Sequence, residues 1–152
     1  MVQYSGAYAL VLVLHLLTVV FVVGPVVLTS MQSARHVRAG QVTALRAAAR
    51  TTRLYGLATV ATVLLGSAMI GLGDVGGQWE FSQAWISASY TLWLVATVLT
   101  LVVVVPAQTA AADALDTGQG AADLARRISI AGGVAALAWV AIIVLMVLKP
   151  GA

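Results

Sequence analysis

The sequence contains no cysteine in its 152 residues, and this excludes several kinds of protein. Disulfide-stabilised folds, zinc sites built on thiolates and thiol catalysis all need a residue that the chain lacks. Charged residues are also scarce, because Asp, Glu, Lys and Arg together make up 9% of the chain. A metal or haem would therefore depend on His, Met or carboxylate ligands.

Apolar residues dominate the rest of the composition. Hydrophobic residues account for 61% of the chain, and the mean hydropathy is +1.01. A water-soluble domain of this size has too little interior to hide so much apolar surface. The composition therefore indicates a membrane protein that contacts the lipid bilayer. The pI is near 9.8, but the positive charges follow the apolar segments, so we predict no binding of nucleic acid.

Four segments reach the roughly 20 apolar residues that a helix needs to cross a bilayer. They are residues 7–31, 54–72, 85–105 and 128–148. We predict an all-α polytopic membrane protein, a four-transmembrane-helix bundle built from two helical hairpins. The prediction treats residues 1–152 as a single integral membrane domain.

Positive charges are distributed unevenly between these segments. Residues 32–53 hold five arginines, residues 73–84 hold no Lys or Arg, and residues 106–127 add Arg126 and Arg127. Lys and Arg near the spans favour the cytoplasmic side of a membrane. We therefore expect the first and third connections to be cytoplasmic, both termini to face outward, and the protein to lie in the inner (cytoplasmic) membrane.

Helix-forming residues continue beyond the spans on the predicted cytoplasmic side. Arg46, Arg50 and Arg53 recur at helical spacing and form a predicted cytoplasmic basic face, while Asp113, Asp116 and Asp123 lie on the other cytoplasmic extension, after the third span. Two interpretations stay open at this stage. The arginines pair with these carboxylates across the bundle, or they contact anionic lipid headgroups.

Tyrosines apart, His15 is the one ionisable side chain within a predicted span. At a rise of 1.5 Å per residue it lies roughly 12 Å below the outer surface. The same estimate places Thr62, Trp93 and Trp139 near that depth, so we predict a polar intramembrane layer with one member from each helix. The first interpretation of His15 is a hydrogen-bonded core residue that fixes helix register. The alternatives are a haem or metal ligand, or a proton or quinone site.

Other chemistry has little support in the sequence. We predict no catalytic residue, no metal site and no cofactor; haem at His15 is the one cofactor considered, with Met69 or Met146 as a second ligand. Proline is expected to bend both odd-numbered spans, at Pro25 and Pro106. Small residues at four-residue spacing are typical of close helix packing. The candidate pairs are Ser67 with Gly71, Ser129 with Gly133, and Gly132 with Ala136.

Several short motifs together resemble a known family. They are Leu14-His15-Leu16-Leu17, Gly24-Pro25, Arg35-His36, Gly40, Arg53-Leu54-Tyr55-Gly56, Gly66, Trp85-Ile86 and Pro106. The chain is similar to an uncharacterised bacterial family of four-span integral membrane proteins, distantly similar to copper-resistance D-like and HemJ-type membrane proteins. The resemblance implies a four-helix membrane bundle. It also implies that His15 corresponds to the first-span histidine of relatives associated with haem or copper, although this chain has no lysine or further histidine in its later spans.

These observations favour a structural or accessory role. We predict a non-enzymatic integral membrane protein, either free-standing or packed against a larger membrane complex, with a homodimer as the other possible assembly. A haem- or redox-associated protein that uses His15 is the first alternative. A small transporter or metal permease is the second.

Overall fold

The computed structural model describes residues 5–72 and 79–150. Helices and short turns make up this part of the chain, and no strand occurs within it. Positions 73–78, which belong to the predicted connection between the second and third spans, lie outside the described residues. Helices α3 and α4 are the elements on either side of that connection.

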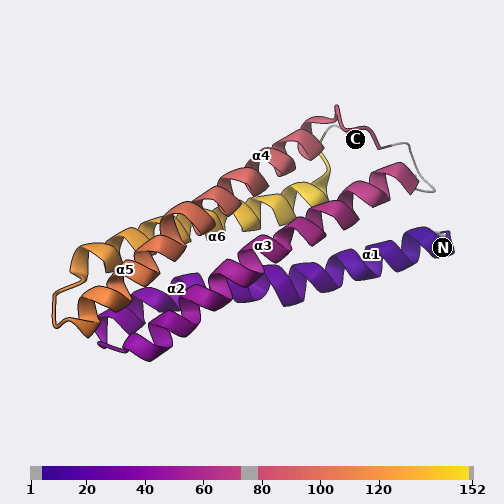
Figure 1. The fold of residues 1–152 in the computed structure, drawn as a ribbon. Helices are drawn as coiled ribbons and strands as arrows, with labels where there is room; N and C mark the ends of the chain where they lie inside the picture. Colours follow the sequence, from indigo (N-terminus) through magenta and orange to yellow (C-terminus); the bar gives the residue numbers. More distant parts are fainter. Residues whose placement is uncertain (1–4, 73–78, 151–152) are drawn as a thin grey trace.

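Four long helices form the bundle in Figure 1. The first comprises α1 (Gly6–Thr18), a π-helical segment η1 (Val19–Val23) and α2 (Gly24–Arg38). The second is α3 (Val42–Leu72). The third comprises α4 (Ala84–Val98), a π-helical segment η2 (Leu99–Val104) and α5 (Val105–Asp116), and the fourth is α6 (Ala122–Leu148). All four are long and apolar enough to cross a membrane, which confirms the predicted fold class.

Two glycine turns close the hairpins at one end of the bundle, which we call the arginine end; the two chain termini lie at the opposite, terminal end (Figure 1). Gly40 has φ +65° and Gly118 has φ +74°, a conformation that side chains other than glycine rarely adopt. In each turn the amide of the following glutamine reaches back to a helix carbonyl, Gln41 to His36 at 3.0 Å and Gln119 to Ala114 at 2.8 Å. Both hairpins thus use the same Gly-Gln helix ending.

A π-helical segment precedes proline in both odd-numbered spans. The Gly24 amide bonds to the Val19 carbonyl and the Val105 amide to the Thr100 carbonyl, five residues back in each case. Proline lacks an amide hydrogen, and its ring crowds the carbonyl four residues earlier. A wider turn relieves this crowding. The structure therefore accommodates Pro25 and Pro106 inside continuous spans.

Close helix contacts fill the arginine end. Helix α2 packs against α3 and α6, and α5 packs against the same two helices. Leu45 and Ile128 are fully buried there among alanines of α2, α5 and α6. Gly132 lies so close to Ser30 that an added Cβ would stand 3.4 Å from the serine Cβ. Small residues let these helix backbones approach each other.

Two other glycines of the predicted pairs do not meet a neighbouring helix of the same chain. An added Cβ at Gly71 or at Gly133 would meet nothing within 4 Å, so neither glycine lies at a close helix contact within the bundle. Spacing alone does not tell which face of an apolar helix meets a neighbour, because lipid and protein both accept apolar residues. Gly132 is the glycine of the predicted pairs that does lie at a contact.

The terminal end is held by aromatic side chains. The Lys149 ammonium lies 4.2 Å from the ring centroid of Trp79, and Trp79 meets Trp85 edge to face at 5.5 Å. Tyr90 reaches across from α4 to share a 2.5 Å hydrogen bond with Ser67 of α3. These contacts tie α3, α4 and α6 together, while α1 packs mainly on α3.

Candidate functional site

His15 is buried against α3. Its Nδ1 lies 2.9 Å from the backbone oxygen of Thr62. A carbonyl oxygen only accepts hydrogen bonds, so Nδ1 carries the proton and Nε2 keeps a lone pair. Among the described residues, the imidazole makes no hydrogen bond other than the one to Thr62. The imidazole therefore fixes α1 on α3 and leaves one nitrogen with acceptor capacity.

Gly66 makes room for that ring. An added Cβ at Gly66 would lie 3.2 Å from His15 Cε1 and 3.6 Å from Nδ1. The contact with Cε1 is shorter than nearly all real Cβ contacts, so a larger residue would force the imidazole or the helix to move. His15, with 8% of its surface exposed, thus packs directly on the backbone of α3.

The other predicted members of the polar layer lie in a neighbouring contact. Trp93 Nε1 donates a 3.2 Å hydrogen bond to Thr59 Oγ1, one turn along α3 from Thr62. Trp139 is buried in an apolar cluster with Val23 and Ala96, and Trp93 packs against this cluster. The structure therefore joins His15 to Thr62 and places Trp93 beside the cluster of Trp139. That the four side chains act as one layer stays a prediction.

Two polar atoms near this layer lack a partner among the described residues. They are Thr62 Oγ1 and Trp139 Nε1, and both are buried. Leaving a buried hydroxyl or indole N–H unpaired typically costs about 1 to 3 kcal/mol. The half of the bundle toward the terminal end thus contains buried polar atoms with unused hydrogen-bonding capacity.

A second polar cluster lies toward the arginine end and was not predicted from the sequence. Gln108 Nε2 donates to Ser33 Oγ at 2.7 Å and to Thr52 Oγ1 at 3.2 Å. Thr52 Oγ1 lies 2.9 Å from Thr29 Oγ1. We call these four residues the inner polar cluster; it joins α2, α3 and α5. Gln108 follows the predicted third span, 85–105, so the sequence places it in the helix extension outside the apolar segment.

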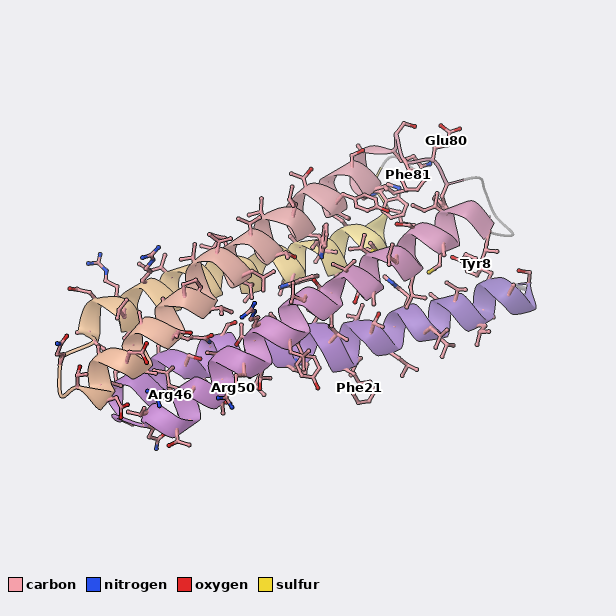
Figure 2. All side chains as sticks on the ribbon, in the orientation of Figure 1. Tyr8, Phe21, Arg46, Arg50, Glu80 and Phe81 are labelled. Carbon is pink, nitrogen blue, oxygen red and sulfur yellow. The ribbon has the colours of Figure 1, made fainter. Side chains whose placement is uncertain are left out.

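The predicted basic face makes one set of ion pairs. Arg46 donates to Asp116 Oδ2 at 2.9 Å and to Asp113 Oδ1 at 3.3 Å. These side chains are about half exposed, with 47% for Arg46 and 57% for Asp116. Arg50 and Arg53 are exposed on α3, and Figure 2 shows Arg46 and Arg50 near the arginine end. Arg46 therefore links the two hairpins, as one of the two open interpretations proposed.

Metal ligands are few in this arrangement. No group of three His, Cys, Asp or Glu side chains that could hold a metal ion occurs in the described part of the chain. His15 offers a single nitrogen, and His36 is engaged with Gln41 Oε1 at 2.7 Å on the surface. The chemistry that the site supports is hydrogen bonding between helices and, at Nε2, one ligand bond.

Comparison with known proteins points to one family. A family model described as "Predicted integral membrane protein (DUF2269)" matches residues 9–150. No curated protein and no solved structure matches the chain. The match includes the second, third and fourth long helices completely and all but the first three residues of the first.

Proposed function

Since the chain belongs to the DUF2269 family of predicted integral membrane proteins, we propose that it is a non-enzymatic structural or accessory protein of the inner membrane. The observation that carries this proposal is the use of the intramembrane polar groups. His15 bonds to α3, Trp93 bonds to α3, and Gln108 bonds to both α2 and α3. Polar residues used in this way are typical of interhelical contacts that fix a bundle.

The first span supplies, over α1 and η1, the surface that suits an accessory role. Leu14, Leu17 and Phe21 are exposed at a spacing of three and four residues, which places them on one face. Figure 2 shows Phe21 pointing away from the other helices. A helix of another membrane subunit is the first partner that we propose for this face, and a second copy of the chain is the runner-up.

The test is the mass of the assembly after mild extraction from membranes of cells that express the protein natively. We expect a heteromeric complex of fixed stoichiometry. The triple variant Leu14→Ala, Leu17→Ala and Phe21→Ala is expected to release the partner. The matched control is Leu137→Ala, Val140→Ala and Val144→Ala, which removes exposed side chains at the same spacing from α6. A monomeric wild-type protein, or equal loss in both triples, contradicts the accessory role.

The free nitrogen of His15 supports a second candidate function, a haem- or redox-associated protein. Its Nδ1 proton is held by the Thr62 carbonyl, and this arrangement is typical of a histidine that ligates a metal through Nε2. Haem bound there would supply one-electron chemistry. The chain's own part is to orient the imidazole and to shield it from water.

A haem titration followed by visible absorption tests this candidate. Purified protein is mixed with hemin, and we expect a Soret band that His15→Ala abolishes and His36→Ala retains. His36 is a suitable control because its imidazole lies on the surface beside Gln41. A spectrum without a Soret shift, or equal binding by both variants, rules out haem binding at His15.

A further inference from the structure

A groove runs along the surface between η2 and α6 toward the arginine end. Its volume is about 490 Å³. Leu99 and Val103 form one wall and Ile130 and Val134 the other, with Ala131 at the base. Ile130 and Val134 are about half exposed, so this apolar groove faces the surroundings of the bundle.

Charged side chains close one end of the same groove. Asp123, Arg126 and Arg127 line it, and all three are exposed on the first turns of α6. Eight residues separate Arg126 from Val134, which is about 12 Å along the helix. The groove is therefore basic at one end and apolar over the next two turns.

The two arginines have no competing ion pair within the described residues. In the described part of the chain, the salt bridges to carboxylates are made by Arg46, which does not line this groove. Asp123 lines the groove with Arg126 and Arg127 but forms no salt bridge with either of them. Two positive charges face one negative charge at this end of the groove. The local charge therefore favours an anionic group.

A second groove of about 640 Å³ provides an internal comparison. It lies between α3 and the third span, where Arg53 and Asp113 line it beside Leu57 and Leu101. One positive charge faces one negative charge there, and Asp113 already binds Arg46. The second groove therefore has similar apolar walls without a net positive end.

We infer that the groove between η2 and α6 is a binding site for an anionic phospholipid. One acyl chain lies between η2 and α6, and the phosphate binds the guanidinium groups of Arg126 and Arg127. Guanidinium groups match phosphate oxygens through paired N–H donors. Basic pockets beside transmembrane helices bind anionic headgroups for the same reason. This inference is independent of the proposed accessory role.

Native mass spectrometry of the full chain tests the site. The protein is released from bilayers of phosphatidylcholine that contain a minor fraction of phosphatidylglycerol, and the retained lipid is counted. We expect wild-type protein to retain phosphatidylglycerol preferentially. Each arginine near a membrane surface contributes about 1 kcal/mol to binding of an anionic lipid, so Arg126→Gln with Arg127→Gln is expected to reduce retention about 30-fold.

Two matched controls separate the site from overall charge and folding. Arg35→Gln with Arg38→Gln removes the same charge from exposed positions of α2 that line neither groove, and it is expected to retain the lipid. Val134→Phe places a larger side chain in the apolar groove, and this variant is expected to lose the bound lipid. Leu137→Phe adds the same ring on the exposed face of α6, outside the groove, and this variant is expected to retain the lipid. Equal retention of both lipids by wild type, or equal loss in the two arginine pairs, overturns the inference.

Discussion

Helices α1 and α4 are equivalent halves of the two odd-numbered spans, yet they are attached to the bundle in different ways. Each is followed by a π-helical segment and a proline. Helix α4 packs along α6 and buries Trp85, Ile86, Ser89 and Ala96. Helix α1 packs mainly on α3, and its buried residues are Tyr8 and His15.

This difference makes His15 important for the attachment of α1 to the bundle. Helix α4 has an apolar cluster with α6 and additional hydrogen bonds to α3 through Tyr90 and Trp93. Helix α1 has no residue in either of the two buried apolar clusters of the described chain. His15, through its contacts with Thr62 and Gly66, is one of the two buried residues by which α1 is attached to the bundle. Perturbing these contacts is expected to move α1 and to leave α4 in place.

Gly66→Val is expected to have the largest effect. The new side chain overlaps the His15 ring, and overpacking a buried site costs about 1 to 3 kcal/mol. The distance between α1 and α3 is measured with spin labels attached at Leu10→Cys and Leu64→Cys, and it is expected to increase. The chain has no native cysteine that would also be labelled. Gly71→Val is the control because its added Cβ meets nothing within 4 Å. An unchanged distance in Gly66→Val would contradict the contact.

His15→Ala is expected to lower the free energy of unfolding by about 2 kcal/mol, because it removes a hydrogen bond and buried ring contacts. His15→Phe removes the hydrogen bond but keeps an aromatic ring of similar size in contact with α3, so its loss is expected to be smaller. Labels on Leu94→Cys of α4 and Val140→Cys of α6 are expected to keep their distance in both variants. Movement of α4 together with α1 would show that the two attachments are not independent.

Trp93→Phe is expected to cost about 1 kcal/mol through loss of the bond to Thr59. Helix α4 keeps its position because its packing on α6 remains. A double-mutant cycle with Thr59→Val measures the pair directly by thermal unfolding in detergent. Additive losses in the double variant would indicate that the indole and the hydroxyl do not interact.

Arg46→Gln is expected to have the smallest effect. Its pairs with Asp113 and Asp116 are about half exposed, and such pairs contribute about 0 to 1 kcal/mol. High salt is expected to remove most of the difference between variant and wild type, because it screens exposed charges. A loss that stays the same at high salt would point to packing of the Arg46 stem instead.

Much of the fold was predictable because its signals are local. The length of each apolar segment indicates a spanning helix, and both hairpin turns carry Gly-Gln after a helix. Burial of His15 was expected because an imidazole facing lipid is costly. Gln108 was missed because its neighbours are small and mildly polar, a composition that suits an exposed helix as well as a tight contact.

The sequence by itself determined how many helices form and where they turn, since apolar length and glycine conformation act within a few residues. Only the tertiary structure decided which faces meet. His15 and Thr62 are 47 residues apart in the chain, and Gln108 and Ser33 are 75 apart. In a bilayer every face of an apolar helix is compatible with lipid, so hydropathy does not fix the rotation of a helix about its axis. Glycine contacts and polar bonds between helices decide that rotation, and they exist only after the helices assemble.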